Sequence, residues 1–121
     1  MTEPLPTATY PEILAIKSGD QYPLIRVTEI DWIEADGNYA RLHIGKTPRL
    51  INRTLTELEE RVLDPERFLR IHRSTIVNLD RVASMAPLFH GEYSIRLKDG
   101  TRLVCSRRFR SRLRQRIYFT S

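Results

Sequence analysis

Residues 68–80 contain the side chains whose types and spacing could do the most specific chemistry. Two apolar segments flank the polar run His72-Arg73-Ser74-Thr75, and such a run belongs on a turn or another surface feature. The planar guanidinium of Arg73 and the hydroxyls of Ser74 and Thr75 suit phosphate oxygens and base edges, and the His72 ring can donate from either nitrogen. A solvated turn that is merely basic explains the segment equally well, so the rest of the chain must decide.

The same segment holds the ingredients of a hydrolase triad, because His72, Ser74 and Asp80 lie within nine residues. They fall on predicted strand and turn, and the sequence has no Gly-x-Ser-x-Gly motif, so we expect no triad. The histidines His43, His72 and His90 are far apart with no Cys pair nearby, which argues against a zinc site. A Walker lysine motif and a Gly-rich phosphate loop are also missing. We therefore expect no enzyme activity, no catalytic residue, no metal site and no cofactor.

The charge is distributed unevenly along the chain. The net charge is +5, but residues 1–36 hold two basic and seven acidic residues, and residues 37–121 hold eighteen basic and eight acidic ones. Seventeen of the twenty basic residues are Arg, which recognises phosphates and base edges in a bidentate manner better than Lys does. This pattern favours a nucleic acid as partner, with an anionic membrane surface second.

The C-terminal segment, residues 101–121, contains seven Arg and no acidic residue. Its Arg stems could simply cover the edge of the core in an ordinary solvated face. However, six Arg within ten residues repel one another, and a polyanionic partner would remove that repulsion. We therefore expect Arg107 and Arg108, at the start of a last helix, to contact a nucleic acid.

Length and composition indicate one globular domain. With 121 residues, 40% of them hydrophobic and 29% charged, the chain can bury a core. No apolar run approaches the ~20 residues of a membrane span, and residues 1–11 do not resemble a signal peptide. These eleven residues are predicted to be a disordered leader or linker, and residues 12–121 the domain. The single Cys105 excludes an internal disulfide and fits a cytoplasmic protein.

The elements that must position these side chains are mostly short strands. Turn signals at residues 18–20, 36–38 and 98–100 separate them. Trp32 is expected to pack in the core rather than stack on bases. The predicted strands cover residues 13–17, 22–27, 31–35, 39–44, 49–51, 92–97 and 101–105, and two more flank the polar run.

Two helices are predicted. Thr54 and Glu57 form a capping-box pattern for a helix over residues 55–62, whose early acidic residues argue against a position in a DNA groove. Ser106 is expected to N-cap the last helix. The apolar face of that helix is predicted at Phe109, Leu113, Ile117 and Tyr118.

Three segments, residues 33–39, 72–78 and 104–109, resemble in order and spacing the LytTR family of DNA-binding domains, usually the output half of bacterial response regulators. The middle segment is the most specific, and the resemblance runs from about residue 12 to residue 118. The chain departs from the family at Thr75, where an aromatic residue is usual, and at Cys105, where valine is usual. Both are expected to be packing positions.

The resemblance implies a mainly β fold, an elongated stack of small antiparallel sheets with one mid-chain helix and a C-terminal helix. It also implies sequence-specific binding of double-stranded DNA by loops at residues 36–39, 72–74 and 106–108, each inserted in a groove. For two positions a structural role stays open, because Asn38 can simply hold a turn and Tyr39 can pack. The DNA-binding residues so implied are Asn38, Tyr39, Arg41, His72, Arg73, Ser74, Arg107 and Arg108.

The implied role is that of a bacterial transcriptional regulator, either stand-alone or as an output domain cut from a longer chain. Its expected partner is double-stranded DNA with two repeated half-sites, on which the domain could form a homodimer. No membrane or small-molecule substrate is expected. Two other classes stay open: a small β-barrel that binds RNA or single strands, and a basic protein-interaction module. Preference for duplex over single strand at matched salt separates these classes.

Overall fold

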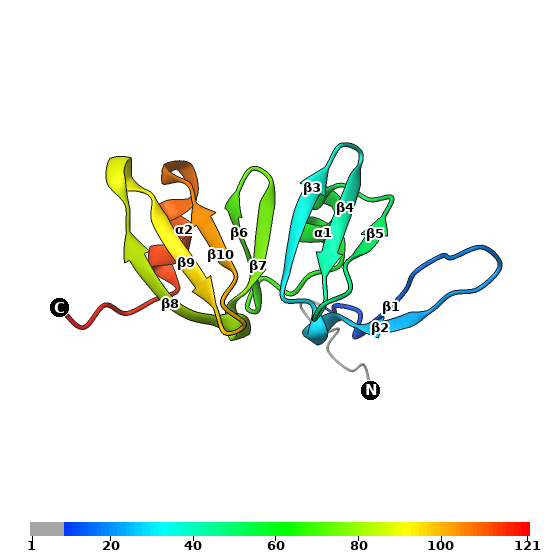
Figure 1. Ribbon diagram of the computed structural model, residues 1–121. Helices are drawn as coiled ribbons and strands as arrows, with labels where there is room; N and C mark the ends of the chain where they lie inside the picture. Colours follow the sequence, from blue (N-terminus) through cyan, green and yellow to red (C-terminus); the bar gives the residue numbers. More distant parts are fainter. Residues whose placement is uncertain (1–8) are drawn as a thin grey trace, which may run out of the picture.

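The computed structural model describes residues 9–121, so most of the predicted leader lies outside the described residues. The described chain forms an elongated row of small antiparallel sheets (Figure 1). Its strands are β1 (Ile13–Ala15), β2 (Leu24–Arg26), β3 (Trp32–Asp36), β4 (Tyr39–His43), β5 (Arg49–Ile51), β6 (Phe68–His72), β7 (Thr75–Asn78), β8 (Val82–Pro87), β9 (Tyr93–Leu97) and β10 (Arg102–Cys105). The helices are α1 (Leu55–Arg61) and α2 (Arg110–Gln115), with short 3-10 turns η1 (Val27–Glu29), η2 (Leu79–Arg81), η3 (Phe89–Gly91) and η4 (Arg107–Phe109). The predicted mainly β architecture is confirmed.

The strands are arranged in three sheets. The largest has the order β5-β4-β3-β7-β6, a second has the order β10-β9-β8, and β1 and β2 form a separate hairpin. The β6–β7 hairpin lies in the middle of the row, with the three-stranded sheet on one side and β3, β4 and β5 on the other (Figure 1). This central hairpin carries the polar run of residues 72–75.

Two hydrophobic cores meet at the central hairpin. Phe68 and Ile76 belong to the core that also contains residues of β3, β4 and α1. Ile71 and Val77 belong to the core that contains residues of β9, β10 and α2. Because successive strand residues point to opposite faces, a strand buried on both faces must be apolar at consecutive positions, as β7 is. The hairpin is therefore anchored from both sides.

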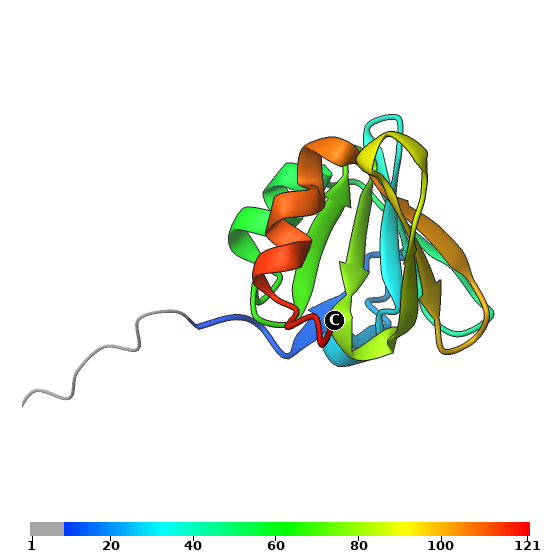
Figure 2. The ribbon, with the colours of Figure 1, turned by 90° about the vertical axis from the view of Figure 1, so that its left-hand side faces the viewer.

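Both helices cover the same side of the row of sheets (Figure 2). Leu55 and Leu58 bury one face of α1, and Leu113 is buried on α2. The predicted N-cap of α1 is confirmed, because the Thr54 hydroxyl accepts a hydrogen bond from the backbone N–H of Glu57 at 3.1 Å. Within residues 9–121, no helix has the length and apolar character needed to cross a membrane.

The central turn is shorter than the polar run of residues 72–75. His72 and Thr75 pair with each other across the hairpin, which leaves Arg73 and Ser74 as a two-residue turn. A register shift between Arg70 and His72 accompanies this pairing. Of the predicted loop at residues 72–74, His72 is the end of β6 rather than part of the turn, because a polar side chain on an exposed strand end looks like a turn residue in the sequence.

Two predictions for the last helix were also wrong. Ser106 precedes η4, but its side chain makes no capping hydrogen bond, and its carbonyl oxygen instead accepts from the Phe109 N–H at 3.0 Å. Tyr118 does not extend the apolar face, because α2 ends at Gln115 and the Tyr118 side chain is 91% exposed. Phe109 and Leu113 are buried as expected.

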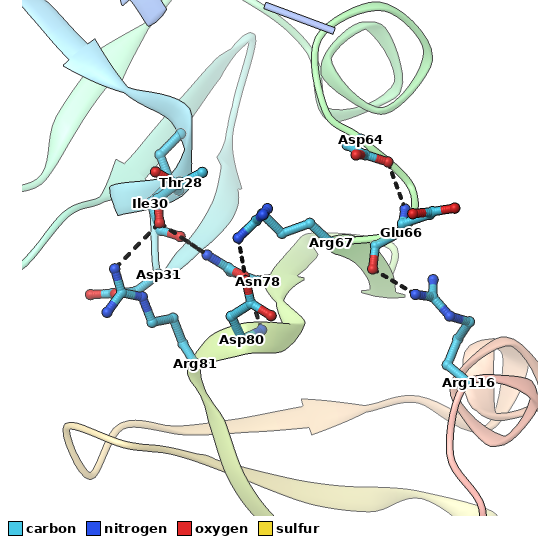
Figure 3. A network of polar contacts seen from close by, with 10 residues as sticks. All are labelled: Thr28, Ile30, Asp31, Asp64, Glu66, Arg67, Asn78, Asp80, Arg81 and Arg116. Atoms are coloured by element: carbon cyan, nitrogen blue, oxygen red, sulfur yellow. Dashed lines mark hydrogen bonds and ion pairs between the residues drawn. The ribbon is translucent and has the colours of Figure 1, made fainter. Parts of the chain in front are cut away.

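A buried amide joins the segment before β3 to the end of the neighbouring strand β7 (Figure 3). The Asn78 side chain is fully buried, and its Nδ2 donates to the carbonyl oxygens of Thr28 at 3.3 Å and Ile30 at 2.9 Å. Its Oδ1 accepts from the backbone N–H of Asp80 at 3.0 Å. The amide therefore connects the segment before β3 to the end of β7. It also provides hydrogen-bond partners for backbone N–H and C=O groups that form no bond within a sheet.

Candidate nucleic-acid interface

Three turns that are distant in the sequence lie on one edge of the molecule. They are the β3–β4 turn, the β6–β7 turn and the connection from β10 to α2, and they stand together at the top of both views (Figures 1 and 2). We call this surface the loop edge and define it by residues 36–39, 72–74 and 106–108. The structure thus brings the three predicted DNA-binding loops to one edge of the molecule.

The middle turn holds His72 in a defined orientation. The backbone N–H of Ser74 donates to Nδ1 of His72 at 3.1 Å, and the Ser74 hydroxyl lies 2.9 Å from the same nitrogen. An N–H donor requires an unprotonated Nδ1, so neutral His72 carries its proton on Nε2. The carbonyl oxygen of Ser74 accepts from the N–H of Ala35 at 2.9 Å, which fixes this turn against β3. His72 can therefore present Nε2–H as a donor, while Ser74 mainly shapes the turn.

Arg73 occupies the tip of this turn. Its side chain is exposed, and it forms no ion pair with any residue in the described part of the chain. Its carbonyl oxygen accepts from Nη2 of Arg70, whose Nε donates to the carbonyl oxygen of His72 at 3.1 Å. The backbone of the tip is thus held in place, and the Arg73 guanidinium can turn to a ligand.

Arg70 and Glu59 support the middle turn and were missed by the sequence analysis. Nη1 of Arg70 lies 3.2 Å from the Glu59 carboxylate, and the Arg70 side chain is only 16% exposed. Glu59 also pairs with Arg112 at 3.3 Å, so one carboxylate joins α1, β6 and α2. The only signal in the sequence was an Arg at an otherwise apolar strand position, and its partner eleven residues away could not be inferred.

The residues predicted to bind DNA in and after the β3–β4 turn differ in exposure and in their contacts. Gly37 has a φ of +62°, which provides the tight turn, and Asn38 is exposed at its tip. Tyr39 is 46% exposed and lines a groove of about 620 Å³ beside β5 and α1. Arg41 pairs with Asp36 at 2.5 Å, so its charge is largely neutralised within its own hairpin. Of these residues, Asn38 is the one most freely presented on the loop edge.

The third turn is fixed to the central hairpin through its backbone. The N–H of Ser106 donates to the carbonyl oxygen of Ile71 at 2.8 Å, next to the middle turn. Arg107 and Arg108 follow with exposed side chains, and the Arg108 guanidinium lies 5.9 Å from the centre of the Phe109 ring. Arg73 and Arg108 line the same surface pocket, so the start of the Arg-rich segment, residues 107–116, lies beside Arg73 on the loop edge.

The Arg-rich segment divides into two functional parts. Its later side chains bind protein groups: Arg112 the Glu59 carboxylate at 3.3 Å, Arg114 the Tyr93 hydroxyl at 2.7 Å, and Arg116 the Pro65 and Glu66 carbonyl oxygens at 2.5 Å. The earlier side chains form neither an ion pair nor a side-chain hydrogen bond within residues 9–121; these are Arg107, Arg108 and Arg110. The Arg side chains of residues 107–116 that bind no protein group therefore lie toward the loop edge.

Comparison with known proteins identifies the family. The LytTr DNA-binding domain family matches residues 20–118, which is most of the chain. The chain belongs to this family. Membership confirms the resemblance seen in the sequence, and it makes this LytTR domain a DNA-binding regulatory domain.

Similar proteins include bacterial regulators. The LytTR domain is 23% identical over 105 residues to the sensory transduction protein LytT of Bacillus subtilis, covering 87% of this chain and 43% of LytT. It is 41% identical over 64 residues to the CO-responsive transcriptional regulator RcoM of Rhodospirillum rubrum, covering 53% of this chain and 27% of RcoM. The chain therefore spans less than half the length of these relatives.

A solved structure shows the same fold. It is the LytTr DNA-binding domain of a protein described as a methyl-accepting/DNA response regulator from Bacillus cereus. The two structures agree with a TM-score of 0.80 at 22% identity, over 90% of this chain and 99% of the other. This chain and that domain therefore share one fold.

Proposed function

We propose that this LytTR domain binds double-stranded DNA in a sequence-specific manner by inserting the turns of its loop edge into the grooves. The observation that carries this proposal is the alignment of three sequence-distant turns on one edge, two of which carry Arg side chains that form no ion pair within residues 9–121. Turns held by buried strands present side chains with little loss of conformational entropy, which favours base recognition over a diffuse charge contact.

Different residues are proposed to have different roles. Arg73 contacts a guanine, because its guanidinium is free and its backbone is fixed by Arg70. Nε2–H of His72 and the amide of Asn38 donate to base edges or phosphates nearby. Phosphate contact is proposed for Arg107 and Arg108. The remaining predicted residues, Tyr39, Arg41 and Ser74, are proposed to border the DNA and shape the turns.

We also propose the biological setting. The domain acts in the bacterial cytoplasm as the DNA-binding part of a transcriptional regulator, in keeping with LytT and RcoM, which are longer than this chain. It binds two repeated half-sites, and two copies pair on DNA while free copies are largely monomeric. Sedimentation of the free domain checks this: a tight dimer at low concentration without DNA would contradict pairing on DNA alone.

The DNA proposal is tested by binding to duplex and single-stranded forms of one selected sequence at matched salt. We expect a clear preference for the duplex. The logarithm of the affinity should fall linearly with the logarithm of the salt concentration, with a slope of about −0.9 per phosphate neutralised. Equal binding to both forms, or duplex affinity that does not change with salt, would overturn the proposal.

The alternative of single-strand binding lacks the required surface. Such proteins stack successive bases on aromatic side chains along one sheet. The most exposed aromatic side chains of the described chain are Tyr22, Phe89 and Tyr118, and each lies on a different element or tail. No series of stacking platforms can be built from them.

A further inference from the structure

A fourth connection reaches the loop edge, and no proposed DNA contact uses it. The connection between β8 and β9 contains η3 and stands at the same height as the three turns in both views (Figures 1 and 2). In Figure 1 it lies outside the β10–α2 connection, at the end of the row. A duplex that follows the loop edge would therefore pass this connection at one end of the contacted segment.

The tip of this connection is an exposed aromatic ring. Phe89 is 86% exposed and the preceding Leu88 is 43% exposed, so two apolar side chains stand in solvent next to each other. Exposed apolar groups that gather on a surface often mark a binding site. Phe89 makes no aromatic stacking contact within the described residues. Packing of the folded domain therefore does not explain why this position is aromatic.

The backbone of the connection is built to hold this ring in place. His90 has a φ of +61° and Gly91 a φ of +81°, and the N–H of Leu88 donates to the carbonyl oxygen of Glu92 at 2.8 Å. A Cβ atom on Gly91 would lie 2.5 Å from Nη1 of Arg110, so the two segments touch. The ring thus projects from a defined turn that packs directly against the Arg-rich segment.

The positively charged side chains next to the connection indicate the chemistry of a partner for Phe89. Gly91 lies against Arg110 and near the Arg107 side chain, both of which form no ion pair in the described part of the chain. An apolar ring beside cations matches a duplex surface, where phosphates alternate with apolar sugar faces and groove floors. DNA-binding proteins use such apolar side chains as wedges against base steps.

We propose that Phe89 is a fourth DNA contact of this domain, packing its ring into the groove that flanks the segment bound by Arg107 and Arg108. This inference rests on the proposed function, because it requires the loop edge to face the duplex. The contact is apolar and insensitive to sequence. It extends the bound segment at one end only, since the connection lies at one end of the row.

The test compares Phe89→Ala with the unchanged domain on a selected duplex with long flanks and on versions shortened stepwise from each end. Tyr118→Ala is the matched control, because Tyr118 is also an exposed aromatic, at 91%, but lies in the C-terminal tail away from the loop edge. We expect Phe89→Ala to weaken binding to the long duplex about tenfold, the effect of losing one buried apolar side chain. The salt slope should not change, and Phe89→Trp should retain affinity.

The duplexes shortened from each end show which flank the Phe89 ring contacts. Removal of the flank at one end should abolish the difference between Phe89→Ala and the unchanged domain, and removal at the other end should preserve it. An unchanged affinity of Phe89→Ala for the long duplex would overturn the inference, as would a loss that is equal on every shortened duplex. Failure of the proposed function looks different, because the unchanged domain itself would then show no preference for duplex DNA.

Discussion

The guanidinium of Arg70 holds the backbone of Arg73. Nη2 of Arg70 donates to the Arg73 carbonyl oxygen, Nε donates to that of His72 at 3.1 Å, and Nη1 lies 3.2 Å from Glu59. The mostly buried Arg70 side chain therefore fixes the tip of the central turn, and the Glu59 carboxylate holds Arg70 in turn. The guanidinium of Arg73 is available to a ligand, because the position of the Arg73 backbone does not depend on any contact of that guanidinium.

Replacing Arg70 should loosen the turn without removing a DNA contact. Arg70→Ala leaves two turn carbonyl groups without their donor and should lower the free energy of unfolding by about 1–3 kcal/mol. It should also reduce the affinity for a selected duplex more than the affinity for a scrambled one. Urea unfolding and binding titrations measure the two effects.

Arg53→Ala is the matched control for Arg70→Ala. Arg53 pairs with Glu57 at 3.0 Å, but both side chains are well exposed, so its loss should cost at most about 0.5 kcal/mol. If Arg70→Ala behaves like Arg53→Ala in both measurements, Arg70 does not position the turn.

The buried amide of Asn78 should be a major determinant of stability. Asn78→Ala removes the donor for Thr28 and Ile30 and the acceptor for the Asp80 N–H, all in a fully buried site. Backbone groups left unsatisfied in such a site cost about 1–3 kcal/mol. We expect a fall of that size or larger in the free energy of unfolding, measured in urea.

The control for Asn78→Ala is Asp80→Asn, which leaves the Asn78 bonds intact but removes the charge that pairs with Arg67. That pair is exposed, so the change should be below about 1 kcal/mol. An Asn78→Ala variant as stable as Asp80→Asn would show that the amide does not stabilise the junction between the segment before β3 and the end of β7.

The central hairpin shows how much of the fold the sequence could predict. Strands on both sides of the polar run were predicted because most of the flanking apolar residues are β-branched or aromatic. The structure buries Ile76 and Val77 in different cores. The loop predicted at residues 72–74 was placed correctly, but its first residue, His72, pairs with Thr75 as a strand residue although both are polar. Local pattern thus located the element but could not set its register.

Contacts between distant segments explain what the sequence could not show. Asn78 was noticed only as part of a family motif, because its partners lie 48 and 50 residues earlier. The run of Arg after Ser106 looked uniform, yet Arg112 binds Glu59 and Arg107 binds no carboxylate within residues 9–121. The packing of α2 against β6 and α1 determines which Arg side chains bind protein groups and which are available to a ligand.

The Cys105 thiol should be unreactive in the folded domain. The side chain is fully buried, and this burial raises the pKa of the thiol from 9.0 to about 11. A thiol-reactive dye at pH 8 should therefore label Cys105 only as fast as the domain opens, and urea should accelerate the labelling. Fast labelling of the folded domain would contradict the buried position.

The same shift predicts a pH dependence of stability. The folded-state pKa of Cys105 is raised, so its contribution to stability is fully present below pH 9.0 and is lost as the pH rises through about 11. Cys105→Val removes the titrating group and should show a weaker decrease in the free energy of unfolding over this interval. Equal decreases in both proteins would show that other groups cause the loss.

The central claim is that the turn of β6 and β7 recognises base sequence, and the ratio of affinities for a selected and a scrambled duplex tests it most directly. Arg73→Ala should lower this ratio about tenfold or more, because a bidentate contact to guanine contributes about 1–3 kcal/mol of discrimination. Arg112→Ala should leave the ratio unchanged and weaken both duplexes slightly, because Arg112 is engaged with Glu59. Circular dichroism must show that both variants fold. An unchanged ratio in Arg73→Ala, with duplex binding intact, would contradict the account.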